Sequence, residues 1–266
     1  MQTLKKYRNR YSTRIGHALL RRRQEDRYIA AYPRSGSTWL RTILSNVLVP
    51  NANGDPSVFN QLIPAVSIRN APVINRLASP RLIMTHRDWQ PEISKAVYLV
   101  RDGRDVLISS YHYHISREQR QASLDEFWSE YMGEVYGPLW HHQITSWLKS
   151  GAEKMGDLLL VVYFEALKND THQQVRKVCD FLDIEYSQPQ LDYAIEYASL
   201  ENARAIERQN KGELANSHQS FYRAGASLQW KNPEYEALIR KFESLSRDAL
   251  ELARYGLFFE SASISS

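Results

Sequence analysis

The 266-residue sequence has one cysteine and no apolar run that approaches the roughly 18 residues of a membrane-spanning helix. A single cysteine excludes an intrachain disulfide and any metal site built from several cysteines. Cys179 shares a helical face with Val175, Val178 and Leu182, so we expect it in the core. Because the chain has neither an apolar span nor a signal peptide pattern, we expect it in the cytoplasm. Its length fits one domain over residues 1–266.

Acidic side chains are absent before Glu25, whereas residues 1–23 carry eight cations: Lys5, Lys6, Arg8, Arg10, Arg14, Arg21, Arg22 and Arg23. Apolar residues recur there at spacings of three and four, namely Leu4, Tyr7, Tyr11, Ile15, Ala18 and Leu19. This pattern predicts a basic amphipathic N-terminal helix over residues 1–26. The helix either caps the domain with its arginines in solvent or contacts an anionic partner, such as a membrane surface or nucleic acid.

The sequence also lacks the G-x-x-x-x-G-K-[ST] spacing of the common phosphate-binding loop, yet residues 28–41 have a related design. An apolar run ends at Pro33, and a loop of small hydroxylated residues with one cation follows. Trp39, Leu40 and Ile43 then begin a helical apolar pattern. A strand, a tight loop and a helix N-terminus together predict an anion site, because backbone N–H groups and the helix dipole point at the loop. The alternative is an ordinary helix cap rich in serine.

Two more apolar runs end at polar residues. Residues 82–85 form a short predicted strand that ends at His86, and residues 96–100 form a buried one that ends at Arg101. Asp102 is expected to cap the next helix, which places Ser109 in its second or third turn. Strands alternating with helices favour a parallel sheet whose ligands bind at the carboxyl ends of the strands. Arg34 and Arg101 could therefore hold two phosphates of one nucleotide, although Arg101 could instead form a surface salt bridge.

Residues 50–80 are rich in proline and asparagine, and we interpret them as an irregular wall over a substrate site. Further along, the pattern predicts two helices over 126–132 and 138–149 and a strand over 158–162. Asp170 and Gln173 are expected to start a helix that runs to Leu182. A last helix presents Leu238, Phe242, Leu245, Ala249 and Leu252 to the core.

These motifs, in this order, resemble those of the sulfotransferases that use 3′-phosphoadenosine 5′-phosphosulfate (PAPS). Residues 32–39, Tyr-Pro-Arg-Ser-Gly-Ser-Thr-Trp, look like the family's 5′-phosphosulfate loop. Arg101 with Ser109 resembles its 3′-phosphate motif, and Thr85-His86 its catalytic histidine position. Residues 136–140, 163–165 and 222–225 are similar to its central helix, its Tyr-x-Glu segment and its late Arg-Lys-Gly loop. The resemblance covers residues 27–258 and implies a three-layer P-loop-like α/β fold, with a central parallel β-sheet flanked by helices.

The resemblance also implies roles for individual residues. Arg34 and His86 would be catalytic, His86 as the general base that takes a proton from a hydroxyl or amine acceptor. The residues implied to bind PAPS are Arg34, Ser35, Gly36, Ser37, Thr38, Trp39, Arg101, Ser109, Tyr163, Ser199, Arg223, Ala224 and Gly225. Three positions depart from the family pattern: Arg34 and Ala224 stand where lysine is usual, and Met84 replaces a lysine common in cytosolic animal enzymes.

The resemblance implies no metal, and the histidines at 112, 114, 141 and 142 lack a convincing ligand spacing. A P-loop-type kinase or another ATP-using transferase is the rival enzyme interpretation. It would need a lysine-ending glycine-rich loop and an acidic magnesium ligand. A basic protein that binds nucleic acid or a membrane surface through residues 1–23 is the other alternative. The identity of the acceptor is not predicted by the sequence.

Overall fold

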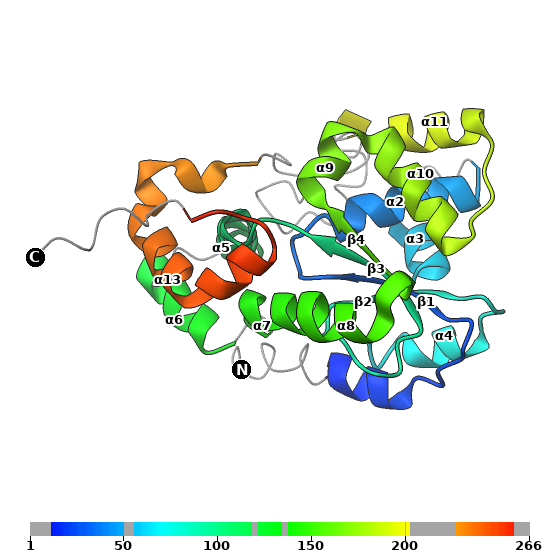
Figure 1. The fold of residues 1–266 in the computed structure, drawn as a ribbon, viewed down its shortest axis with the longest axis horizontal. Coiled ribbons are helices and arrows are strands. Elements are labelled where there is room, and N and C mark those ends of the chain that lie inside the picture. Colours follow the sequence, from blue (N-terminus) through cyan, green and yellow to red (C-terminus); the bar gives the residue numbers. More distant parts are fainter. Residues whose placement is uncertain are drawn as a thin grey trace, which may run out of the picture.

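A four-stranded parallel sheet lies at the centre of the computed structural model, which describes residues 12–50, 56–118, 122–134, 138–199, 201–202 and 227–257 (Figure 1). Its order is β2-β1-β3-β4, and the strands are β1 (Arg27–Ala31), β2 (Leu82–Thr85), β3 (Lys95–Val100) and β4 (Leu159–Tyr163). The predicted strands are thus confirmed to within a residue. Since β1 lies between β2 and β3, the chain segments that follow these three strands emerge side by side.

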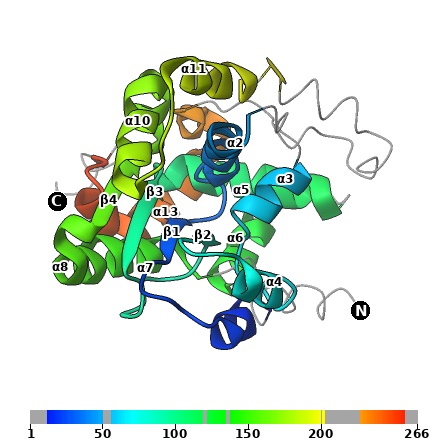
Figure 2. The same ribbon diagram turned by 90° about the vertical axis from the view of Figure 1, so that its right-hand side faces the viewer.

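The side chains of the sheet alternate between two apolar layers, as the period of two along a strand requires. Tyr28 and Ala30 point into one core cluster, whereas Ile29 and Ala31 point into the other. The first cluster is completed by α5, α6, α7 and α13, and the second by α2, α10 and α11 (Figures 1 and 2). The predicted three-layer fold with helices on both faces of a parallel sheet is confirmed. Cys179 is fully buried in the second cluster, as expected.

Helices cover both faces of the sheet, and several lie where apolar patterns predicted a helix, whereas those over residues 164–169 and 188–197 were not predicted. On the first side of the sheet lie α5 (Gly103–Glu118), α6 (Leu124–Met132), α7 (Trp140–Thr145), the π-helical turn η1 (Ser146–Gly151), α8 (Ala152–Met155) and α13 (Glu236–Leu252). On the second side lie α2 (Ser37–Leu48), α9 (Phe164–Asn169), α10 (Thr171–Leu182) and α11 (Gln188–Tyr197). Short 3-10 turns cover η2 (Gly156–Leu158), η3 (Gln229–Lys231) and η4 (Pro233–Tyr235).

Two predicted helix starts are confirmed by their caps. Asp170 accepts a hydrogen bond from the Gln173 backbone N–H at 3.0 Å, and Asp102 accepts one from the Arg104 N–H at 3.0 Å. Asp102 also forms an ion pair with the Arg104 guanidinium, which reaches Glu243 of α13 at 2.7 Å. This buried network joins the segment after β3 to the last helix.

Three expectations were wrong in detail. Residues 50–80 are not irregular throughout, because α3 (Pro56–Leu62) and α4 (Ala71–Arg76) form within them; the apolar residues there bury one face of each short helix. The predicted helix over 138–149 begins only at Trp140 and changes to π-helical geometry at Ser146. Within the described residues, the basic N-terminal helix covers 12–19 and ends before the turn at residues 24–25, rather than continuing to 26.

Candidate active site

The loop between β1 and α2 has an unusual backbone. Arg34 has φ 71° and Gly36 has φ 94°, both in the left-handed region. A Cβ on Gly36 would lie 2.6 Å from Cδ2 of Phe164, so this position requires glycine for space as well as for conformation. The loop therefore holds a compact turn directly before the first residue of α2, and the first N–H groups of that helix point into it.

This loop suits an anion. The first turn of α2 contains no acidic side chain. Its N-cap residue is Gly36, which has no side chain to accept a hydrogen bond from the first N–H groups of the helix. Ser35 is buried, and its Oγ makes no hydrogen bond within the described part of the chain. A buried hydroxyl costs free energy when it is left unsatisfied, so a bound oxyanion would stabilise it. Ser37 is buried and Thr38 half-buried beside it.

Arg34 and Arg101 meet although they are far apart in the sequence. The Arg34 Nε donates a hydrogen bond to the Ser109 Oγ at 3.1 Å, and its guanidinium lies 4.6 Å from the ring centroid of Tyr113. The Arg101 Nη1 donates to the Arg34 carbonyl at 2.9 Å. Arg101 is buried, and burial lowers the pKa of its guanidinium, while Asp105, Glu165 and Asp102 oppose that shift. The two predicted cationic junctions form one cluster.

Phe164 joins the parts of this cluster, and we did not single it out from the sequence. Its ring packs against Gly36, meets Trp39 edge-on at 6.1 Å between centroids, and faces the Arg101 guanidinium at 4.5 Å. Phe164 is the first residue after β4, so the only signal in the sequence was its place at a strand end.

His86 lies directly after β2, beside the end of β1. Its Nδ1 is 2.7 Å from the carbonyl oxygen of Ala31. Because a carbonyl only accepts, Nδ1 carries the proton and Nε2 is the basic nitrogen of the neutral ring. Burial lowers the pKa of His86, with Arg41 acting in the same direction and the bond to Ala31 opposing it. The imidazole is therefore neutral at pH 7, as a general base requires.

Gln143 of α7 fixes the backbone at this point, a role that we did not predict. Its Nε2 donates to the His86 carbonyl at 2.7 Å, and its Oε1 accepts from the Tyr98 hydroxyl at 3.2 Å. The sequence analysis did not single out Asp88 either. Burial raises the pKa of its carboxyl group, and its Oδ1 makes no hydrogen bond among the described residues. Its only signal in the sequence was its position two residues after His86.

Two further predicted residues, Tyr163 and Ser199, make contacts of their own. Tyr163 faces Tyr255, with 6.0 Å between ring centroids, and Ser199 follows the end of α11, where its Oγ accepts from the Asn202 N–H. Arg223, Ala224 and Gly225 lie outside the described residues, as do Tyr136 and Gly137. Downstream of that loop, the N–H groups of Leu228 and Gln229 donate to Asp105 at 2.8 and 2.9 Å.

Comparisons with known proteins identify the family of this chain. Residues 24–254 match the family described as the sulfotransferase domain. This chain belongs to the sulfotransferase family. Sulfotransferase 2A2 of Mus musculus is 27% identical over 258 residues, covering 89% of this chain and 88% of the mouse protein. Cytosolic sulfotransferase 3 of Arabidopsis thaliana is 26% identical over 245 residues, covering 85% of this chain and 77% of the plant protein.

Solved structures share the fold of this sulfotransferase. A mouse sulfotransferase complexed with PAP superimposes with a TM-score of 0.66 at 18% identity, covering 94% of this chain and 96% of that one. A retinol dehydratase in complex with retinol and PAP also has a TM-score of 0.66, at 19% identity, covering 87% of this chain and 83% of that one. These similarities establish the architecture.

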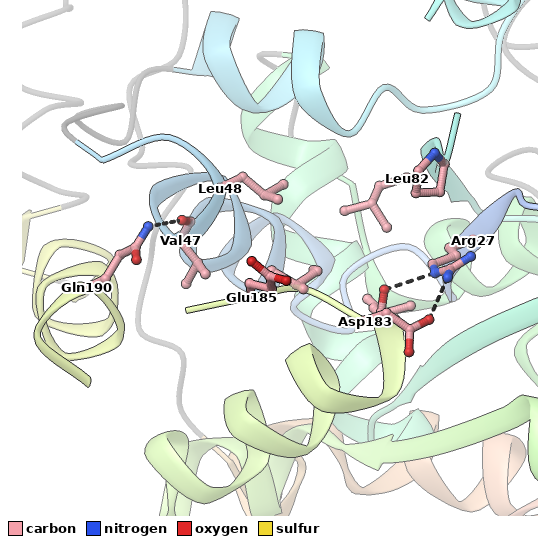
Figure 3. A pocket seen from close by; sticks show the side chains of 10 residues that line it. Arg27, Val47, Leu48, Leu82, Asp183, Glu185 and Gln190 are labelled. Atoms are coloured by element: carbon pink, nitrogen blue, oxygen red, sulfur yellow. Dashed lines mark hydrogen bonds and ion pairs between the residues drawn. The ribbon is translucent and has the colours of Figure 1, made fainter. Parts of the chain in front are cut away.

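Other features of the sulfotransferase lie away from the cluster. A pocket of about 310 Å³ opens beside Arg27 and Leu82, the first residues of β1 and β2 (Figure 3). It therefore lies at the amino ends of the strands, opposite His86 and Arg101, and Arg27 is paired there with Asp183.

In the described part of the chain, no three His, Cys, Asp or Glu side chains form a group that could hold a metal ion. No helix described here has the length and apolar character needed to cross a bilayer.

Proposed function

We propose that this sulfotransferase moves a sulfuryl group from PAPS to a hydroxyl or amine acceptor and releases 3′,5′-ADP. The observation that carries the proposal is the contact between the two cationic junctions. Arg34 reaches Ser109 at 3.1 Å, and Arg101 reaches the Arg34 carbonyl at 2.9 Å. A nucleotide with a phosphate at each end of its ribose needs two such junctions at one sheet edge.

The 5′-phosphosulfate would bind at the start of α2. The loop N–H groups would donate to the 5′-phosphate, together with the hydroxyls of Ser35, Ser37 and Thr38. The left-handed Gly36 and the buried Oγ of Ser35 support this assignment. Arg34 would neutralise the charge that builds on the bridging oxygen, and Trp39 would flank the nucleotide or support the loop.

The 3′-phosphate would bind Arg101 and Ser109, completed by Arg223 and the N–H group of Gly225 from the late loop. Ala224 would contribute only its backbone. Tyr163 and Ser199 would contact the adenine. Charge-assisted hydrogen bonds to phosphate are stronger than neutral ones, so the 3′-phosphate would supply a large part of the donor affinity.

The chemistry requires an in-line displacement at sulfur. The acceptor oxygen or nitrogen forms a bond to sulfur while the bond from sulfur to the 5′-phosphate oxygen breaks, and that oxygen leaves on 3′,5′-ADP with the bonding electrons. His86 would take the acceptor proton on Nε2, because Nδ1 is held by Ala31. The partial positive charge of the loop stabilises the departing oxygen.

Relatives support the donor and the acceptor classes. PAP is named in the complexes of the mouse sulfotransferase and of the retinol dehydratase. The alcohol retinol is bound in the latter, and a 26% identical relative from Oryctolagus cuniculus is an amine sulfotransferase. A hydroxyl or amine acceptor is therefore proposed for this chain.

The test is turnover of PAPS against a library of alcohols, phenols and amines, read by mass spectrometry as the addition of a sulfuryl group. Formation of 3′,5′-ADP with a sulfated product is expected. The rival kinase is tested with ATP and magnesium in the same library, where no phosphorylated product is expected. Stabilisation by ATP equal to that by PAPS, without sulfated product, would contradict the proposal.

A further inference from the structure

The N-terminal helix over residues 12–19 packs with the face opposite to its apolar stripe. A Cβ on Gly16 would lie 2.4 Å from the backbone carbon of Ser67, so this residue allows the helix to approach the neighbouring segment closely. His17 and Leu20 are buried with it, and the His17 Nε2 lies 3.0 Å from the Thr85 Oγ1. The docking surface of the helix is therefore made by Gly16, His17 and Leu20.

The outward face consists of aliphatic residues. Ile15 is 45% exposed and Leu19 is 50% exposed, and Ala18 between them is also exposed. The sequence pattern led us to expect these residues to face the domain if the helix simply caps it. In the sequence, the same spacing continues backwards to Tyr11, Tyr7 and Leu4.

This face borders the segment that contains α4. The Ile68 N–H donates to the Ser12 carbonyl at 3.0 Å, and the Asn75 Nδ2 donates to the Leu19 carbonyl at 3.0 Å. Ile68 and Val73 of this segment are 40% and 47% exposed. Figures 1 and 2 both show the dark-blue helix beside α4 at the lower border of the molecule, with no described element beyond it. We name Ile15, Ala18, Leu19, Ile68 and Val73, with the exposed arginines around them, the N-terminal face.

The charged residues of the two segments that contribute to the N-terminal face are all cations. Residues 1–24 and 56–87 together carry twelve Lys and Arg and no Asp or Glu. Arg14, Arg21, Arg69 and Arg76 are exposed in these segments. The chain as a whole has 30 acidic residues, and all of them lie outside these two segments.

We infer that the N-terminal face binds the surface of an anionic lipid bilayer, with the helix over residues 12–19 lying in the headgroup region. Exposed aliphatic side chains enter the boundary between headgroups and acyl chains, and arginines around them bind anionic headgroups. A single-stranded nucleic acid would instead be contacted by exposed aromatic side chains that stack on bases, whereas the described uncharged side chains of this face are Ile, Leu, Ala and Val. A duplex would be bound by the arginines alone, which leaves the exposed aliphatic side chains without a role. The face thus matches a lipid in both polarity and charge.

The test is co-sedimentation of the full chain with phosphatidylcholine vesicles, with and without about one-third phosphatidylserine. Binding is expected only with phosphatidylserine, and it should weaken as the salt concentration rises. Ile15→Ser with Leu19→Ser should weaken binding at least about tenfold, because two aliphatic side chains no longer enter the bilayer. Arg14→Gln with Arg21→Gln should weaken it by about fivefold for each charge.

Leu158→Ser is the matched control, because Leu158 is also 50% exposed but lies in η2, outside this face. It should bind vesicles as the parent does, and turnover of a soluble acceptor should show that all variants are folded. Equal binding to neutral and anionic vesicles would overturn the inference, as would unchanged binding of the Ile15→Ser, Leu19→Ser variant. A dimer in sizing experiments that this variant abolishes, or binding to a single-stranded oligonucleotide but to no vesicle, would overturn it too.

Discussion

His86 is held with one ring nitrogen on the Ala31 carbonyl, so only Nε2 is left to take a proton. We expect His86→Ala to lower turnover by about 100- to 10,000-fold and to leave 3′,5′-ADP binding nearly unchanged. Because burial lowers the pKa of His86 from 6.5, the neutral base persists below that pH. The acid limb of the parent's rate profile should therefore lie below pH 6.5 and disappear in the variant.

The control for this experiment is His172→Ala, since His172 is about half-exposed and lies against Asp192 on the outer side of α10. Its turnover should match that of the parent. Near-normal turnover of His86→Ala with an alcohol acceptor would show that another group removes the proton. The nearest carboxylate in the sequence is Asp88.

Arg34 should contribute more to rate than to donor affinity. Arg34→Ala is expected to lower turnover by about 100-fold or more, because in the proposed mechanism its charge would face the departing oxygen. Arg34→Lys keeps the charge but loses the planar guanidinium that binds Ser109, so its turnover should fall between those of the parent and the alanine variant. Steady-state kinetics with PAPS and one identified acceptor measure the turnover and the donor affinity of both variants. Equal turnover for the parent and Arg34→Ala would show that Arg34 only shapes the loop.

At the scale of elements, the junction of β1 and α2 depends on a glycine that packs directly against the ring of Phe164. Gly36→Ala introduces a Cβ 2.6 Å from that ring at a φ of 94°, and left-handed strain of this kind costs about 1–3 kcal/mol. We expect a lower melting temperature together with weaker 3′,5′-ADP binding, measured by calorimetry. Gly256→Ala is the control, because nothing lies within 4 Å of its added Cβ. A normal melting temperature and affinity for Gly36→Ala would contradict this view of the loop.

For the whole molecule, 3′,5′-ADP should stabilise the fold far more than 5′-AMP does. Without a 3′-phosphate, Arg101 and Ser109 have no ligand charge to meet, and each charge-assisted bond is worth about 1.5–3 kcal/mol. Thermal shifts at equal nucleotide concentration measure the difference, which Ser109→Ala should reduce. Equal shifts with both nucleotides would show that the 3′-phosphate is bound elsewhere or not at all.

Acid should destabilise the whole molecule through His17. Burial, with Arg87 and Arg22, lowers the pKa of His17 to about 3. The unfolded chain takes up a proton near pH 6.5 while the folded chain does not, so stability is lost as the pH falls through this window. His17 alone should contribute about 2 kcal/mol to the loss between pH 6.5 and 5, and His86 and His141 add to that loss because burial lowers the pKa of each. Denaturant unfolding at both pH values measures the total, and His17→Gln should reduce it by about the His17 share. An equal loss in the parent and in His17→Gln would assign the acid sensitivity to other groups.

The sequence by itself determined the local structure of this protein. Strand ends at Ala31, Thr85 and Val100, the caps at Asp102 and Asp170, and the turn around Gly36 all follow from apolar periodicity and side-chain chemistry within a few residues. A parallel sheet with helices on both faces follows from the alternation of such elements. The family motifs could be recognised because they lie at these strand ends.

Only the tertiary structure decided which distant residues meet. The strand order β2-β1-β3-β4 places His86 beside Ala31 and brings Arg34 to Ser109, 75 positions away. The contacts of Phe164 with Arg101 and of Gln143 with the His86 carbonyl could be found only in the tertiary structure. The same holds for the helix over residues 12–19: its periodicity shows an apolar stripe, but the close approach of Gly16 to Ser67 turns that stripe outward. Periodicity specifies that a helix has two different faces, and packing against the rest of the chain specifies which one is covered.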